Sequence, residues 1–250
     1  MDLIWFYIFL PLVAMTYGAV GYGGASGYLA LMGLFSFVPD EMRPTALVLN
    51  LFVAGIAFIH FARLGYFKFK TFAIFAAASI PMAFLGGTFN IETGLYKVIL
   101  GIFLLLSVAK MVGLLDEFLN KGDYDSSSKR VNLPLGLGVG AGIGFFSGLI
   151  GIGGGIILSP ILLLSRWANA KETAAISALF IWVNSVAGLS GQYYHDELFL
   201  NEQLILMIIL VVAGGFIGGY IGAKKLNNKK LRYLLSLMLF VAALKLILGQ

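Results

Sequence analysis

One glycine pattern occurs twice in this chain, each time in the middle of an apolar stretch. The first copy reads GAVGYGGA at residues 18–25, and the second reads GLIGIGGG at residues 148–155. At an offset of 130, the glycines at 18, 21, 23 and 24 fall on those at 148, 151, 153 and 154. Because a glycine inside a helix costs up to roughly 1 kcal/mol relative to alanine, such clusters indicate places where the backbone itself must be exposed.

The amino-acid composition of the whole chain indicates that it folds in a membrane. Of its 250 residues, 60% are hydrophobic and 12% are charged, whereas ordinary globular domains carry about 25% charged residues. Six apolar runs approach the ~20 residues that cross a bilayer: 45–61, 71–89, 95–108, 173–189, 204–223 and 231–243. The N-terminus lacks the basic region of a signal peptide, so it is expected to be an uncleaved first membrane segment. The sequence predicts an all-α, multi-pass membrane protein.

The same composition argues against several other functions. The net charge of +5 comes from lysines and arginines in short loops, where they set membrane topology rather than form a nucleic-acid-binding face. The chain has no cysteine and two histidines, which leaves no thiol chemistry and little for a metal site. No nucleotide-binding glycine motif and no acidic pair within a span is present, so we expect neither an enzyme nor a cofactor.

The chain also divides into two similar halves. A polar linker at 116–132 separates residues 1–115 from residues 133–250. At an offset of 128, Thr45-Ala46 falls on Thr173-Ala174, and the glycine pair at 86–87 falls on the pair at 214–215. Each half is predicted to hold one glycine-interrupted segment, at 3–38 or 133–165, followed by three ordinary spans.

Loop charges indicate that the halves face opposite sides of the membrane. The loop after the first full span is basic in the first half, with Arg63, Lys68 and Lys70, whereas its counterpart reads His195-Asp196-Glu197. The next loop reverses the comparison, because residues 224–232 carry a basic run. The positive-inside rule then predicts an inverted-topology repeat with a cytoplasmic linker, external termini and eight to ten membrane segments.

Each glycine-interrupted segment is too long for one crossing. A helix of 36 residues would reach ~54 Å, against a hydrocarbon thickness of ~30 Å, so each segment is predicted to fold back as a hairpin with its glycines at the apex. Residues 156–165 would reach only ~15 Å, which favours a re-entrant or broken arm. A new helix begins at each apex, and its unpaired amides and positive dipole end would bind a small anion without a buried cation. A neutral substrate would also fit the absence of charge.

These features resemble the sulfite exporter TauE/SafE family of bacterial membrane permeases. The resemblance rests on the duplicated glycine cluster, the following Ser159-Pro160, the Thr-Ala opening of the next span, and the overall layout, and it covers essentially the whole chain. It implies a transporter that moves sulfite or small organosulfonates outward across the inner membrane. We expect a secondary transporter that works by alternating access, with one hairpin-bearing half rocking against the other. The first copy departs from the pattern, since Ala25 replaces the third glycine and Ala30 stands opposite Pro160.

The predicted anion-binding residues lie at the two apices and at polar positions of the spans. They are Gly21, Tyr22, Gly23, Gly24, Ala25, Ser26, Gly151, Gly153, Gly154, Gly155, Asn50, Asn184 and Gln192. Arg43 and Lys171 follow the two hairpins at equivalent positions, where they would either steer anions to the entrances or anchor the interface.

Structural alternatives stand beside each of these roles. Glycines also serve tight helix packing, as expected for the stripes at 136, 140, 144 and 148 and at 214, 218 and 222. The polar span residues could instead bond neighbouring helices. The competing functions are a passive anion channel, an importer of a related anion, or a non-transporting scaffold. The expected partners are a small anion and lipid, with no nucleic acid, and a homo-oligomer is left open.

Overall fold

The computed structural model describes residues 3–113, 131–195, 202–224 and 229–248. Over these residues the chain forms ten α-helices and no strand, which confirms the all-α prediction. The helices are α1 (Leu3–Ala19), α2 (Ala25–Leu34), α3 (Pro39–Arg63), α4 (Phe69–Thr88), α5 (Thr93–Val112), α7 (Leu133–Ile150), α8 (Gly155–Leu164), α9 (Ala170–His195), α10 (Leu204–Lys224) and α11 (Lys229–Leu248). Most of the predicted linker, the acidic residues Asp196 and Glu197, and part of the basic run at 224–232 lie outside the described residues.

Among the described residues, five helices are long and apolar enough to cross a membrane, namely α3, α4, α7, α9 and α10. Large apolar side chains such as Ile205 and Ile209 on α10 are exposed on the outer surface, as expected where lipid is the solvent. Helix α3 begins earlier than predicted because Pro39 occupies its first turn, where the fixed φ of proline favours a helix start. The protein is thus a multi-pass membrane protein.

The two predicted hairpins share much of their backbone conformation, although Gly153 of the second turn has a positive φ of 78° and the equivalent Gly23 does not. Each consists of a long arm, α1 or α7, a glycine turn, and a short arm of ten residues, α2 or α8. The turns enter and leave the left-handed region at equivalent glycines: φ is 80° at Gly21 and 87° at Gly151, and 98° at Gly24 and 78° at Gly154. The predicted short arm is therefore confirmed, and the glycines supply dihedral angles that other residues rarely adopt.

The short arms also end in the same way. Ser36 and Arg166, which are equivalent at the offset of 130, have positive φ values of 64° and 56°. The amide of the next residue then bonds back to the helix, from Phe37 to the Met32 carbonyl at 3.0 Å and from Trp167 to the Leu162 carbonyl at 2.9 Å. This left-handed helix ending satisfies carbonyl groups that would otherwise be left unpaired.

The long arm of each hairpin packs against a helix of the other half. Gly140, Gly144 and Gly148 of α7 face the carbonyl oxygens of Phe75, Ser79 and Ala83 on α4, and Gly214, Gly218 and Gly222 of α10 face those of Pro11, Met15 and Ala19 on α1. Residue numbers rise together along each pair, so the paired helices run parallel. The predicted packing stripes are confirmed. The opposite orientation of the halves in the membrane stays a prediction.

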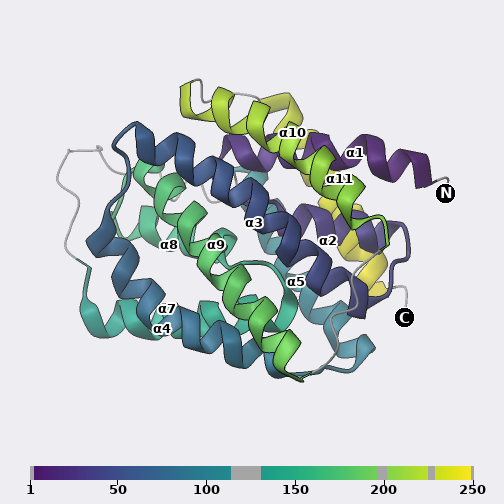
Figure 1. Cartoon of the computed structure of the whole chain (residues 1–250), viewed down its shortest axis with the longest axis horizontal. Helices are drawn as coiled ribbons and strands as arrows, with labels where there is room; N and C mark the ends of the chain where they lie inside the picture. The colour runs from purple at the N-terminus through teal and green to yellow at the C-terminus, as the bar shows by residue number, and fades with distance from the viewer. Residues whose placement is uncertain (1–2, 114–130, 196–201, 225–228, 249–250) are drawn as a thin grey trace.

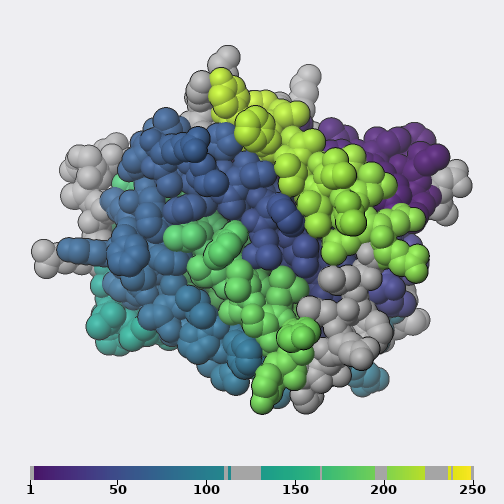
Figure 2. Space-filling model, viewed as in Figure 1, coloured from purple at the N-terminus to yellow at the C-terminus, as the bar shows by residue number. Residues whose placement is uncertain are grey.

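Helices α3 and α9 lie side by side at the centre of the molecule (Figure 1). In the space-filling view, α9 forms a diagonal green band beside α3 and α4 (Figure 2). The end of α3 meets the start of α9, because Lys68 forms an ion pair with Glu172 at 2.8 Å and Lys171 donates to the Tyr66 hydroxyl at 3.0 Å. Loop 64–68 and the start of α9 thus share one face of the protein. Which face is cytoplasmic stays a prediction.

A lysine on α11 fixes the end of the first short arm. Lys245 Nζ donates to the carbonyls of Gly33 at 3.2 Å and Leu34 at 2.8 Å, and to Ser36 Oγ at 3.1 Å. A cation at a helix C-terminus is favourable, although exposure reduces its contribution. We expect Lys245→Met to lower the stability by about 1 kcal/mol, seen as a lower Tm in detergent. Lys245→Arg should keep the wild-type Tm, and an equal loss in both variants would contradict this capping role.

Candidate functional site

The two glycine turns meet at two buried side chains, Asn50 of α3 and Ile181 of α9. The amide of Ala25 donates to Asn50 Oδ1 at 3.0 Å, and Asn50 Nδ2 donates to Ser185 Oγ at 3.4 Å. A side chain added at Gly23 would collide with the Asn50 carboxamide, and one added at Gly153 would lie 2.7 Å from Asn50 Nδ2. The two turns therefore lie on either side of one carboxamide group, midway along α3.

Each turn reaches past Asn50 toward the start of the long helix of the other half. Gly21 lies against Ala174 of α9, where an added side chain would come within 2.8 Å of the Ala174 backbone. Gly151 lies against the backbone of Arg43 on α3, at 3.2 Å from the same hypothetical side chain. Glycine is needed at both positions for the close approach as well as for the positive φ.

The second turn carries a run of unpaired backbone donors. Residues 151–156 are all buried, yet no hydrogen bond leaves the amides of residues 152–156 within the described part of the chain. The Gly154 carbonyl accepts from Ile157 at 3.2 Å and from Leu158 at 3.1 Å, which starts α8. More than 90% of buried amides in proteins are paired, so a buried run without acceptors indicates a place for a ligand or water.

The protein itself satisfies part of the first turn, although the amides of Gly23, Gly24 and Gly27 likewise make no hydrogen bond within the described residues. Ala25, which is equivalent to Gly155, gives its amide to Asn50. The Ser26 hydroxyl shares a hydrogen bond of 2.8 Å with the Tyr17 hydroxyl, and the Tyr28 ring covers Gly24. Tyr22 is half-buried at this turn, and its amide donates to the Tyr17 carbonyl at 2.8 Å.

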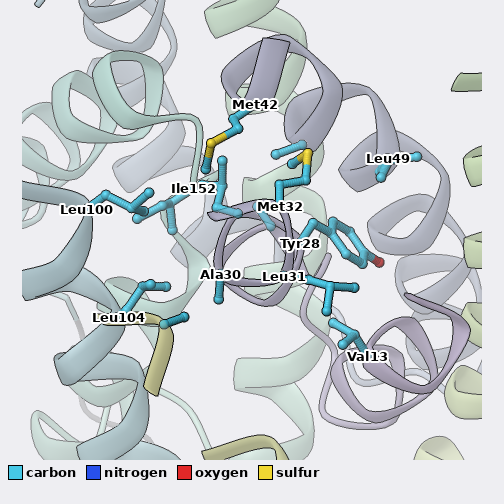
Figure 3. Close-up of a cluster of buried hydrophobic side chains, with 14 of the residues drawn as sticks. Val13, Tyr28, Ala30, Leu31, Met32, Met42, Leu49, Leu100, Leu104 and Ile152 are labelled. Atoms are coloured by element: carbon cyan, nitrogen blue, oxygen red, sulfur yellow. The ribbon is translucent and has the colours of Figure 1, made fainter. Parts of the chain in front are cut away.

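Apolar side chains surround most of both turns, and the one charged side chain named beside them is the buried Arg43, which lies against Gly151. In Figure 3, Ile152 of the second turn points into the same cluster as Met32 of α2 and Met42 of α3. Leu100 and Leu104 of α5 complete that cluster (Figure 3). Electrostatic interactions are stronger in such a low-dielectric environment than in water, so the unpaired amides act with little screening.

Arg43 and Lys171 occupy different environments despite their equivalent sequence positions. Arg43 is only 7% exposed, lies beside Gly151, and donates from Nη2 to the Phe89 carbonyl at 3.2 Å. The prediction put it at an entrance, whereas the structure buries it next to the second turn. Lys171 is half-buried, with its Nζ 4.9 Å from the centre of the Tyr66 ring.

Two predicted polar residues lie in helix contacts rather than at the turns. Asn184 of α9 accepts from Ser79 Oγ at 2.5 Å and donates to the Phe180 carbonyl at 2.8 Å, so both ends of its carboxamide serve the α4–α9 contact. Gln192 is near the end of α9, where its backbone approaches Gly87 of α4. Asn184 therefore bonds a neighbouring helix, which is the alternative to anion binding given above.

Sequence reasoning missed several residues that surround the turns. Ile181 and Ser185 of α9 contact the Asn50 region, and Tyr17 and Ser147 precede the first glycine of each copy. The offset of 130 pairs Tyr17 with Ser147, so the glycine alignment contained a signal for both. Nothing local marked Ile181 or Ser185, because their role depends on the packing of α9 against the turns.

Comparison with known proteins identifies a family. The family model for the sulfite exporter TauE/SafE matches residues 7–246. The chain is 37% identical over 235 residues to the probable membrane transporter protein y4hK of Sinorhizobium fredii, covering 94% of each chain. It is 26% identical over 268 residues to the probable membrane transporter protein MJ0441 of Methanocaldococcus jannaschii, covering 97% of each.

A further relative is longer than this chain. The probable membrane transporter protein MamO of Paramagnetospirillum magneticum is 23% identical over 90% of this chain but only 41% of its own length. No solved structure matches the chain. The match to the family model covers nearly every described residue, and the family consists of membrane transporters rather than enzymes. The chain belongs to the sulfite exporter TauE/SafE family.

Proposed function

We propose that this membrane transporter exports sulfite or a small organosulfonate across the inner membrane as a secondary transporter. The anion would bind at the centre, between the two glycine turns, through backbone N–H groups. The observation that carries this proposal is the buried run of unpaired amides at residues 152–156. Helix N-termini bind anions because their amides are free and their dipole is positive there.

Backbone donors suit an ion that must be released on the far side. A lysine or arginine in direct contact with the anion would hold it tightly, whereas amides supply only partial charges. The buried Arg43 lies beside Gly151 and adds positive charge next to the second turn. The oxygens of a sulfonate or sulfite group can accept from several donors at once. Transport needs a binding site that is strong enough to take up the anion and weak enough to release it.

Alternating access is the mechanism we infer. Both turns are buried, so the centre is closed in this conformation. Helix α1 packs on α10, and α7 packs on α4, so each hairpin contacts a helix of the other half. When the two halves rock against each other, these two contacts would have to shift or move as units. Export of an anion from a cell that is negative inside is downhill by about 2.3 kcal/mol per charge per 100 mV, so uniport suffices. On this proposal both termini face outward.

Purified protein in liposomes tests the function. With radiolabelled sulfite, a carrier should give saturable flux and counterflow driven by unlabelled sulfite inside the vesicles. Conductance that does not saturate would instead identify a channel, and flux equal to that of empty liposomes would identify a scaffold. Reversing the imposed gradient and potential distinguishes an exporter from an importer.

A single substitution tests the site within that assay. Gly155→Val adds a branched side chain over the unpaired amides, and the nearest obstacle is the flexible side chain of Ile181. We expect flux to fall at least tenfold while the protein elutes like wild type, with a Tm lowered by the overpacking cost of about 1–3 kcal/mol against the buried Ile181 side chain. Gly142→Val is the matched control, since Gly142 of α7 is exposed with no neighbour within 4 Å. Normal flux in Gly155→Val would reject this turn as the site.

A further inference from the structure

We propose that the two turns are functionally unequal. The anion is held by the second turn and the α8 N-terminus, with the Ser147 hydroxyl and Asn50 Nδ2 as side-chain donors, while at the first turn the Tyr28 ring covers the N-cap and the Asn50 carbonyl oxygen accepts from Ala25. This assignment rests on the proposed function and names the donor set of its site. The ligand class is an oxyanion with several oxygens, because the donors converge from a backbone turn and two side chains.

The Ser147 hydroxyl is the first independent observation. Ser147 is 1% exposed, and its Oγ has no hydrogen-bond partner within the described residues. Its Cβ lies 3.5 Å from the position that a side chain at Gly154, the N-cap of α8, would take. An unpaired buried hydroxyl beside a helix N-terminus is rare in proteins and here adds a donor to the unpaired amides.

The equivalent position in the first half is occupied differently. Tyr17 stands where the second half has Ser147, and its ring fills the space beside Gly27, at 2.9 Å from the position of an added side chain. The Tyr17 hydroxyl pairs with Ser26 of the α2 first turn at 2.8 Å. The Tyr17 hydroxyl is thus paired within the protein, whereas the Ser147 hydroxyl is not.

The orientation of the Asn50 carboxamide makes its two sides different for an anion. An amide N–H needs an acceptor, so the bond from Ala25 fixes Oδ1 on the side of the first turn and Nδ2 on the side of the second. Nδ2 has two N–H groups, and its bond to Ser185 Oγ at 3.4 Å uses one of them. An anion is therefore repelled by the carbonyl oxygen on one side of Asn50 and attracted by the N–H groups on the other.

Tyr28 closes the equivalent face of the first turn. A side chain at Gly24 would lie 2.6 Å from both the Tyr28 hydroxyl and its ring, so the ring covers this N-cap. The Tyr28 hydroxyl is itself buried without a hydrogen-bond partner within the described residues, so the two N-caps differ in the bulk of the covering side chain and not in the presence of an unpaired hydroxyl. At Gly154 the neighbours are Ile143, Phe180 and Ser147 instead. An aromatic ring thus covers the N-cap of α2, whereas the N-cap of α8 lies next to the small side chain of Ser147.

Equilibrium binding to the purified full chain tests this asymmetry. We would measure binding of radiolabelled sulfite by wild type, Ser147→Ala, Ser147→Thr and Tyr17→Phe, with methanesulfonate and chloride as competitors. Ser147→Ala should weaken sulfite binding at least tenfold, and Ser147→Thr, which keeps the hydroxyl, should restore most of it. Tyr17→Phe, the same position in the first half, should bind within twofold of wild type. Methanesulfonate should compete better than chloride.

The binding results distinguish failure of the asymmetric site from failure of the proposed transport function. Unchanged binding in Ser147→Ala, or an equal loss in Tyr17→Phe, would overturn the asymmetric site while leaving sulfite transport intact. If wild type neither binds nor carries sulfite or methanesulfonate, the proposed function itself fails. Elution volume and Tm of each variant show whether a loss reflects misfolding, and the Thr variant then decides whether the hydroxyl is responsible.

Discussion

Replacing Asn50 by aspartate is expected to reduce transport at least a hundredfold while leaving the protein folded. The new carboxylate would lie between the two turns, where it accepts from Ala25 and Ser185 and faces the unpaired amides beside Gly153. A fixed negative charge would then take the place of the transported anion and repel it. Amide donors around a carboxylate favour its charged form, which offsets the cost of burial.

The stability of this variant distinguishes a site from an ordinary core position. We expect the Tm of Asn50→Asp in detergent to stay within a few degrees of wild type, with flux of radiolabelled sulfite near that of empty liposomes. Asn184→Asp is the matched control, because Asn184 is equally buried but donates to the Phe180 carbonyl, which would repel a carboxylate. Breaking such a buried pairing costs about 3–5 kcal/mol, so this control should fold poorly. Wild-type flux in Asn50→Asp would contradict the central site.

Local sequence signals predicted the hairpins well. Glycines at 21, 24, 151 and 154 lie at dihedral angles that glycine adopts most easily, so their clustering located both turns. The ten-residue distance from the second turn to Ser165 fixed the length of α8. The glycine stripe of α7 predicted close packing, since a four-residue spacing puts small residues on one helix face.

Long-range contacts could not be predicted from these signals. Asn50 and Asn184 look alike in the sequence, as single asparagines within apolar spans, and only their neighbours differ: a glycine turn in one case and Ser79 in the other. The sequence around Arg43 predicts a cation at the membrane interface. Nothing in it shows how far the second turn reaches along α3, which is why the burial of Arg43 could not be predicted. The distribution of donors between the two turns likewise depends on how α3 packs against both hairpins.

Gly144→Val is expected to cause a large loss of stability. A side chain at Gly144 would run into the carbonyl oxygen of Ser79 on α4, and backbone atoms cannot move aside as a flexible side chain can. Helices α7 and α4 would have to separate, which removes packing along their parallel contact. Overpacking typically costs 1–3 kcal/mol, and a backbone obstacle puts this variant at roughly 3 kcal/mol or more.

Gly142→Val separates this steric effect from the general effect of valine in a helix. Gly142 lies two residues away on α7, is exposed, and has no neighbour within 4 Å of an added side chain, so its replacement should change stability by less than about 1 kcal/mol. Thermal unfolding in detergent and the yield of monodisperse protein measure both variants. Since α7 carries the second turn, loss of the α4–α7 contact should also remove sulfite binding. Equal stability of the two variants would mean that α7 does not pack against α4 through its glycine face.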